Sequence, residues 1–249
     1  MQDPRLASPA ANELSGRVIA VTGAGDGIGK AVALAAAAHG AQVILIGRTV
    51  RKLEAVHRDI QSAHGDVSTI APLDLEKALA GDYDRLAAAI LERYGRLDGL
   101  VHCAGILGTL TPIEHYDVPT WCKVLHVNVT AAFVLTQVLL PALRLSADAS
   151  VVFSTSGVGR KGRAYWGAYA VSKFAVEGLT QVLAAEMDGA TTVRVNVLNP
   201  GPTRTLMRRQ AFPSENVETL PEPASVTGPY IALLGSTGQG FNGQSLDCQ

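Results

Sequence analysis

Short runs of apolar residues alternate along most of the chain with longer stretches in which apolar and polar residues recur at helical spacing. The runs at residues 17–22, 41–47 and 149–156 are rich in Val and Ile and have the length of buried strands. The stretches at residues 27–40 and 49–65 each end at a glycine, a common signal for the end of a helix. The pattern therefore predicts alternating strands and helices.

The alternation continues through the rest of the chain. Further strands are expected at residues 67–74, 97–105 and 192–201, and further helices at residues 83–95, 119–145 (interrupted at Pro141) and 166–187. Strands that are apolar throughout and separated by helices are typical of a parallel sheet covered on both faces. We therefore predict an α/β fold, a doubly wound parallel sheet flanked by helices, with ligands bound beyond the carboxyl ends of the strands.

Two segments fall outside this pattern. Residues 1–15 are polar and contain prolines, so we expect a loose extension before a single domain at residues 16–249. Residues 200–223 form a long irregular segment, which is typical of a lid over a substrate site. The first fifteen residues lack the apolar core of a signal peptide, and the longest apolar stretches are broken before they reach the length of a membrane span.

Composition narrows the possible functions. The chain has 249 residues, of which 47% are hydrophobic and 17% charged, so it can bury a large core. A formal net charge of -1 argues against nucleic acid as a partner. Three scattered cysteines are too few for a disulfide framework or a metal site and suit a reducing compartment. We expect a cytoplasmic protein that contains no metal and binds neither nucleic acid nor membrane.

The stretch VTGAGDGIGKA, residues 21–31, places four glycines between a predicted strand and a predicted helix. Glycines permit a tight turn and let the backbone approach a pyrophosphate, while the helix start offers free N–H groups and a positive dipole end. This context favours a dinucleotide site over a plain turn. The spacing, however, differs from the common G-x-G-x-x-G fingerprint.

Thr22, Gly23, Gly27 and Gly29 spell T-G-x-x-x-G-x-G, which resembles the fingerprint of the short-chain dehydrogenases/reductases in their common branch. The stretches GRxGRAxWGAYAxSKFA and NPGxTRTxMR resemble a little-characterised bacterial group of these oxidoreductases. The resemblance extends over most of the chain. It implies a Rossmann-like fold and hydride transfer between a nicotinamide cofactor and a carbonyl or alcohol substrate.

Tyr169 and Lys173 are four residues apart in a predicted helix and so lie on one face, where an ammonium lowers the pKa of a nearby phenol. Tyr169 could then act as a general acid or base near neutral pH, although a pair of this kind alone is more often a surface pair. The family has a serine at the position of Ser156, where it hydrogen-bonds the reacting oxygen. It also has an asparagine at the position of Asn128, which holds a water leading to the lysine. The resemblance therefore implies the catalytic residues Asn128, Ser156, Tyr169 and Lys173.

The family's cofactor contacts also map onto this chain. Asp74 and Leu75 match a pair that contacts adenine, and Thr205 matches a threonine that contacts the nicotinamide carboxamide. The stretch HCAG, residues 102–105, departs from the family's N-N-A-G, so only backbone contacts carry over at Cys103. The implied cofactor-binding residues are Gly23, Asp26, Gly27, Ile28, Gly29, Arg48, Thr49, Asp74, Leu75, Cys103, Ala104, Gly105, Tyr169, Lys173, Pro200, Gly201, Thr203 and Thr205.

The choice between NADP(H) and NAD(H) depends on two positions. Arg48 follows the second strand, where NAD enzymes carry an acid, and its guanidinium can pair with a 2′-phosphate. Asp26 instead favours NAD(H). NADP-dependent relatives often carry a basic residue at this position, and the negative charge of Asp26 would repel a phosphate. We expect NADP(H) rather than NAD(H).

The substrate pocket is expected in the loops at residues 106–115, 157–166 and 202–222, beyond the strand ends. Basic residues in these loops could meet an anionic acyl thioester, or be ordinary solvated charges: Arg160, Lys161, Arg163, Arg204, Arg208 and Arg209. The leading prediction is an NADP(H)-dependent carbonyl reductase or alcohol dehydrogenase. The alternatives are a 3-oxoacyl-carrier reductase and a non-catalytic dinucleotide-sensing protein. By resemblance, the helices at residues 119–145 and 166–187 would form the interface of a homodimer or homotetramer.

Overall fold

The computed structural model describes residues 3, 6 and 8–249. Within this part of the chain, seven parallel strands form one sheet in the order β3-β2-β1-β4-β5-β6-β7. The strands are β1 Val18–Thr22, β2 Gln42–Gly47, β3 Ser68–Pro72, β4 Gly99–His102, β5 Ala149–Ser154, β6 Val193–Asn199 and β7 Ser245–Asp247. Because strand order reverses direction between β1 and β4, a crevice is expected at their carboxyl ends.

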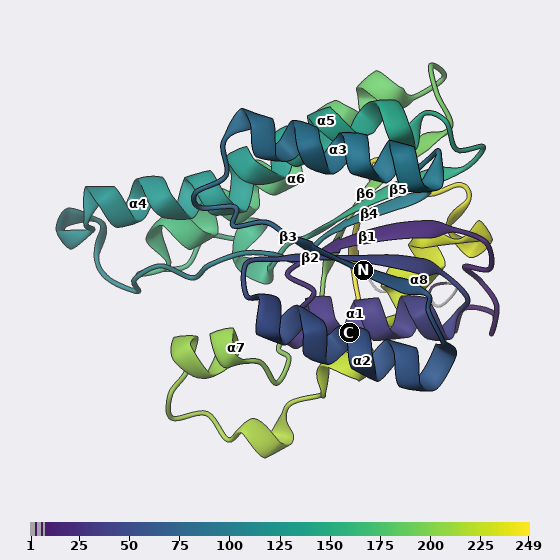
Figure 1. Cartoon of the computed structure of the whole chain (residues 1–249). Coiled ribbons are helices and arrows are strands. Elements are labelled where there is room, and N and C mark those ends of the chain that lie inside the picture. Colours follow the sequence, from purple (N-terminus) through teal and green to yellow (C-terminus); the bar gives the residue numbers. More distant parts are fainter. Residues whose placement is uncertain (1–2, 4–5, 7) are drawn as a thin grey trace.

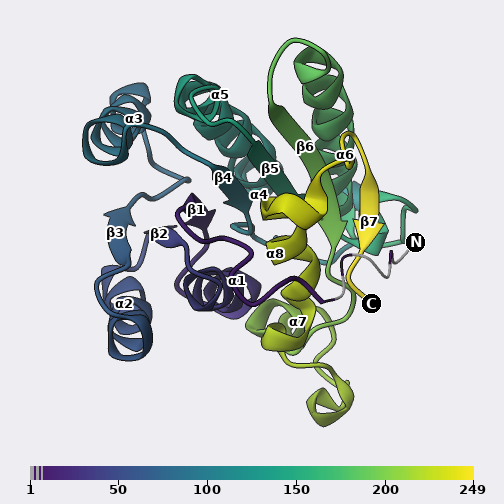
Figure 2. The ribbon, with the colours of Figure 1, turned by 90° about the vertical axis from the view of Figure 1, so that its right-hand side faces the viewer.

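Helices cover both faces of the sheet (Figure 1). α1, α2 and α8 lie on one side, and α3, α5 and α6 lie on the other; the view in Figure 2 shows the same two layers from the end. The helices are α1 Gly27–Ala38, α2 Val50–His64, α3 Ala80–Tyr94, α4 Val118–Leu125, α5 Ala131–Leu143, α6 Gly167–Met187, α7 Leu206–Ala211 and α8 Gly228–Leu234. The predicted doubly wound α/β fold is confirmed.

The core is split by the sheet into two apolar layers. Successive residues of β1 point to opposite faces: Ala20 packs with the α3, α5 and α6 layer, whereas Ile19 and Val21 pack with the α1 and α8 layer. All five residues of β1 are buried. Burial on both faces explains why the strands are apolar throughout instead of alternating.

The long helix predicted at residues 119–145 is built from three parts. α4 and α5 are joined by a π-helical turn, His126–Thr130. In this turn a backbone N–H bonds the carbonyl five residues earlier instead of four. Pro141 does not interrupt the helix, which continues to Leu143. The continuous segment Val118–Leu143 has the length and composition of a membrane span, with a mean hydropathy of 1.6. Its buried side chains pack against the sheet, as in the core helices of many folds, so this is weak evidence for a membrane.

Two regions differ from the sequence-based prediction. The extension is not loose where the structure describes it, because Leu6 and Leu14 are buried and the Glu13 carboxylate accepts a hydrogen bond from the Thr237 N–H (2.7 Å). The remaining extension residues, 1, 2, 4, 5 and 7, lie outside the described residues. The segment 200–223 is not wholly irregular, because it contains α7.

Neither α8 nor β7 was expected; both are too short to show a periodic pattern.

Candidate active site

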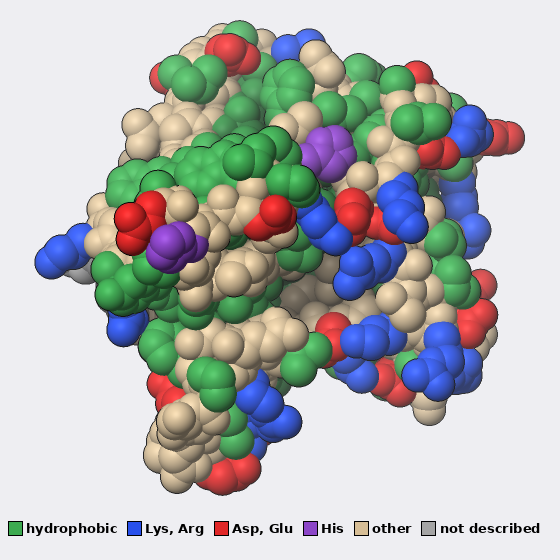
Figure 3. Space-filling view, turned by 90° about the vertical axis from the view of Figure 1, so that its left-hand side faces the viewer, with side chains coloured by type: hydrophobic (Ala, Val, Ile, Leu, Met, Phe, Trp, Pro, Cys, Tyr) green, Lys and Arg blue, Asp and Glu red, His purple; other side chains and the backbone are tan. Residues whose placement is uncertain are grey.

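The predicted site residues converge on one edge of the sheet. Most of them follow the carboxyl ends of β1 to β6. The others lie in helices: Gly27, Ile28 and Gly29 in the first turn of α1, Asn128 in the π-helical turn, and Tyr169 and Lys173 on α6. Figure 3 looks onto this edge and shows a hollow with Lys and Arg side chains crowded along one side.

The glycine turn after β1 is shaped by close backbone contacts. A Cβ on Gly23, whose φ is +68°, would lie 3.0 Å from the Ala104 backbone, and one on Gly29 would lie 2.3 Å from the Gly23 carbonyl oxygen. The Thr22 hydroxyl also accepts a hydrogen bond from the Ala104 N–H (3.1 Å). Only glycine fits at these contacts, so α1 begins tightly against the strand end.

This turn fits the pyrophosphate of a dinucleotide. The amides of Ile28 and Gly29 lie in the first turn of α1, where N–H groups have no acceptor within the helix. These N–H groups and the positive end of the helix dipole favour an anion. Asp26 caps the helix by accepting a hydrogen bond from the Gly27 N–H (2.8 Å).

Tyr169, Ser156 and Lys173 meet beside this turn. The Ser156 hydroxyl lies close enough to the Tyr169 phenol to act on its pKa. The Lys173 Nζ lies 5.6 Å from the centre of the Tyr169 ring and donates a hydrogen bond to the Ser154 carbonyl (2.8 Å). Three of the four predicted catalytic residues are therefore brought together in space.

The pKa values of the pair are set mainly by burial. Burial raises the pKa of Tyr169 to about 12, although the Ser156 hydrogen bond acts to lower it. Burial lowers the pKa of Lys173 to about 8. The predicted net lowering of the phenol pKa is therefore not found, because burial outweighs the effects that favour the phenolate, and the phenol is protonated at neutral pH.

Asn128 links the segment after β4 to α6. Its side-chain oxygen accepts a hydrogen bond from the Ile106 N–H (2.8 Å), and its side-chain nitrogen donates to the Ile106 carbonyl (3.0 Å) and to the Ser172 hydroxyl (3.0 Å). A Cβ on Gly105 would lie 3.3 Å from the Asn128 oxygen and 3.9 Å from the Lys173 Nζ. Asn128 therefore lies close to Lys173, with its own side chain occupied by protein partners.

A buried polar chain behind the lysine was missed from the sequence. The Ser154 hydroxyl contacts the Cys103 thiol (3.3 Å) and the Tyr230 phenol (2.9 Å). Burial raises the pKa of Cys103 to about 11, so this thiol stays protonated at neutral pH. Tyr230 lies on α8, a helix that the pattern did not indicate, and no motif points to it.

The candidate adenosine side lies at the ends of β2 and β3. Arg48 and Thr49 are exposed directly after β2, and among the described residues Arg48 has no ion-pair partner. After β3, Asp74 accepts a hydrogen bond from the Glu76 N–H (3.1 Å), while Leu75 is buried. The predicted contacts for adenine and its ribose thus lie on neighbouring strand ends.

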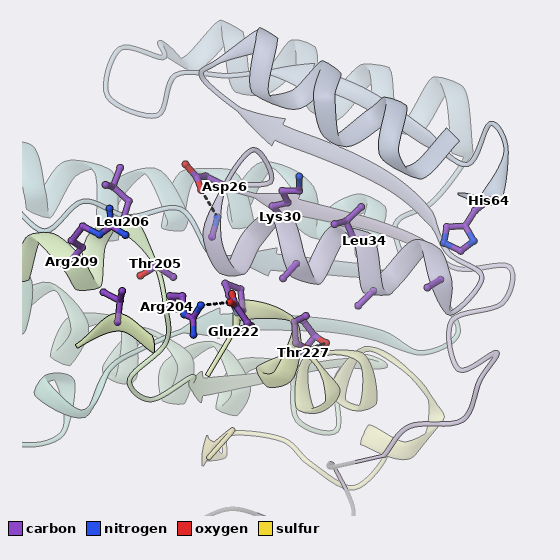
Figure 4. A pocket seen from close by; sticks show the side chains of 17 residues that line it. Asp26, Lys30, Leu34, His64, Arg204, Thr205, Leu206, Arg209, Glu222 and Thr227 are labelled. Carbon is purple, nitrogen blue, oxygen red and sulfur yellow. Dashed lines mark hydrogen bonds and ion pairs between the residues drawn. The ribbon is translucent and has the colours of Figure 1, made fainter. Parts of the chain in front are cut away.

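The segment after β6 faces the glycine turn from the other side. Thr205 caps α7 by accepting a hydrogen bond from the Arg208 N–H (3.1 Å), and its methyl group is 3.5 Å from the position of a Cβ on Gly27. Pro200 and Thr203 are held by the side-chain amide of Gln249. A cavity of about 750 Å³ runs between α1 and this segment, with Asp26 and Thr205 near one end (Figure 4).

Three of the six basic loop residues are committed to ion pairs within the protein. Arg160 pairs with Asp247 (2.6 Å), Arg204 with Glu222 (2.7 Å; Figure 4) and Arg208 with Glu215 (2.5 Å). Arg163 instead lies over the rings of Trp166 and Phe212, at 5.8 and 5.2 Å from their centres. The basic loops therefore offer fewer free cations to an anionic substrate than their sequence suggests.

Comparison with known proteins agrees with this geometry. The family model for short chain dehydrogenases matches residues 17–216, and the chain is 45% identical over 241 residues to the oxidoreductase YciK of Escherichia coli (strain K12), covering 97% of this chain and 95% of that protein. This chain belongs to the short chain dehydrogenase family. Family membership confirms that it is an oxidoreductase.

Solved structures of this family superpose on nearly the whole chain. A protein from Pseudomonas syringae described as a short chain dehydrogenase is 51% identical, with a TM-score of 0.96 and 98% of each chain covered. A short chain dehydrogenase from Escherichia coli CFT073, complexed with NADPH, is 46% identical with a TM-score of 0.94, covering 97% of this chain and 100% of that one. The Rossmann-like fold implied by the glycine fingerprint is thereby confirmed.

Proposed function

We infer that this oxidoreductase uses NADP(H) and transfers hydride between the nicotinamide and a carbonyl or alcohol substrate, with Tyr169 as general acid or base. The observation that carries the proposal is the meeting of Tyr169, Ser156 and Lys173 beside the glycine cradle. The bound cofactor would supply or accept the hydride. The side chains of the protein donate or accept the proton.

In the direction of carbonyl reduction, the protonated Tyr169 phenol donates its proton to the substrate oxygen. The Ser156 hydroxyl donates a hydrogen bond to the same oxygen and stabilises the charge that develops there. Lys173 in its charged form favours the phenolate that the transfer leaves behind. The reverse reaction runs through the same groups, with the phenolate as base.

A cationic side chain at the candidate cofactor site favours NADP(H) over NAD(H). Arg48 is exposed at the end of β2 and is available to a 2′-phosphate, and residues 41–50 contain no acid. The NADPH complex of the E. coli CFT073 relative supports the same choice.

A 3-oxoacyl-carrier reductase is a narrower form of this function. Lys161 and Arg209, which have no ion-pair partner among the described residues, and the ring-stacked Arg163 could meet an anionic carrier arm. The ion pairs of the other three arginines weaken this alternative. A dinucleotide sensor without turnover would not need Tyr169 and Lys173 buried together, since burial of ionisable groups costs stability.

We also propose that the enzyme works as a homodimer or homotetramer in the cytoplasm. Phe133 on α5 and Phe174 and Val182 on α6 are exposed large apolar side chains, typical of a surface covered by a partner. The three cysteines are all free, which fits a reducing compartment.

The test is cofactor oxidation against a panel of ketones, diketones and oxoacyl thioesters, with NADPH and NADH in parallel. We expect turnover with at least one carbonyl class and a higher kcat/KM for NADPH than for NADH. Tight cofactor binding without turnover on any compound would contradict the proposal and favour the sensor. Preference for oxoacyl thioesters over free ketones would favour the carrier reductase.

A further inference from the structure

The turn that cradles the pyrophosphate carries a negative charge of its own. Asp26 is exposed, and one carboxylate oxygen caps α1 through the Gly27 N–H (2.8 Å). The hydrogen bond from Lys52 is the largest of the effects that hold the pKa of Asp26 below its usual value, so this carboxylate is charged at neutral pH. An exposed carboxylate at this point repels a phosphate bound nearby.

Lys52 lies against this carboxylate from the neighbouring helix. Its Nζ is 2.5 Å from the second carboxylate oxygen of Asp26. The backbone brings the two together, because a Cβ on Gly25 would lie 3.0 Å from the Lys52 Cβ. Leu53, the next residue of α2, is buried and packs against Gly47 at the end of β2. The first turn of α2 is therefore fixed beside the glycine turn.

The surroundings of this pair are basic. Arg48 and Arg51 are exposed at the end of β2 and the start of α2, and neither has an ion-pair partner in the part of the chain that the structure describes. The side chains of Lys52 and Asp26 are 47% and 59% exposed, so a bound ligand can contact both. Figure 3 shows cationic side chains gathered along this side of the hollow.

We propose that Lys52 neutralises Asp26 and thereby lets Arg48 select a nucleotide that carries a phosphate monoester on its ribose. Without Lys52, the Asp26 carboxylate would face the same phosphate that Arg48 attracts. The inference rests on the proposed NADP(H) site and assigns a specificity-determining residue to it. It also explains how an acid can stand in this turn where related NADP enzymes often carry a base.

The test is isothermal titration of the whole chain with adenosine 2′,5′-bisphosphate and with 5′-AMP, which differ only in the 2′-phosphate. Lys52→Gln is expected to weaken binding of the bisphosphate about tenfold and to change binding of 5′-AMP less than about twofold. Asp26→Asn keeps a capping side chain on α1 and, added to Lys52→Gln, is expected to restore most of the lost affinity. Arg58→Gln removes one exposed cation farther along α2 as a matched control and should change neither affinity.

Each other outcome contradicts the proposal in a distinct way. If Lys52→Gln leaves the bisphosphate affinity unchanged, or lowers both affinities equally, Lys52 does not act on selection. If the double variant recovers nothing, Lys52 acts on the ligand without neutralising Asp26. If the wild-type chain binds neither nucleotide, the proposed cofactor site itself fails, and the inference fails with it.

Discussion

The protonation of the candidate catalytic side chains depends on burial as much as on their neighbours. Tyr169 and Lys173 are both buried, and burial favours the neutral form of each side chain. It raises the pKa of Tyr169 to about 12 and lowers the pKa of Lys173 to about 8. The spacing of four residues predicted correctly that they lie close together. It could not show that Lys173 bonds the Ser154 carbonyl instead of the phenol, because that contact depends on the end of β5.

The lowered pKa of Lys173 predicts an alkaline limit to carbonyl reduction. Below pH 8 the amine is charged and favours the phenolate formed by proton transfer; as pH rises through the pKa of about 8, that charge is lost. We expect kcat to fall above this pH, measured as a pH profile with saturating NADPH. Lys173→Arg keeps its charge, so its residual activity should lack this fall. The same fall in Lys173→Arg would show that another group titrates.

At the scale of elements, the sequence predicted the six long strands and the helices between them, and the structure bears them out with small shifts of their ends. What the pattern missed are short elements without periodicity, α7, α8 and β7. α8 matters for the site because Tyr230 contacts the strand end that carries Ser154. α6 has two roles: one face holds Tyr169 and Lys173, and the opposite face is apolar and exposed.

The exposed face of α6 predicts self-association. We expect sedimentation velocity to show a dimer or tetramer, and Phe174→Glu to raise the dissociation constant roughly 100-fold or more, because a buried unpaired charge is costly. Leu79→Glu, at the exposed start of α3, is a matched control that should leave the assembly intact. A wild-type monomer, or an assembly unaffected by Phe174→Glu, would contradict an interface on this face.

At the scale of the whole molecule, the sheet order brings together residues that are far apart in the sequence. β1 lies beside β4 and β4 beside β5. The glycine turn, the HCAG stretch and Ser156 therefore lie side by side at the carboxyl ends of these strands. The sequence motifs located this edge because their residues sit at strand ends. They could not locate the Asp26–Lys52 contact or the ion pairs of the basic loops, because such side-chain pairings leave no spacing pattern.

The central claim is that Tyr169 moves the proton in an NADP(H)-dependent carbonyl reaction. The most direct measurement is the turnover of Tyr169→Phe beside wild type, with NADPH affinity and thermal unfolding measured on the same samples. Loss of the phenolic hydroxyl removes the proton donor, so we expect kcat to fall by roughly 10²- to 10⁴-fold while NADPH still binds and the fold is retained. Near-normal turnover by a folded Tyr169→Phe enzyme would contradict the claim.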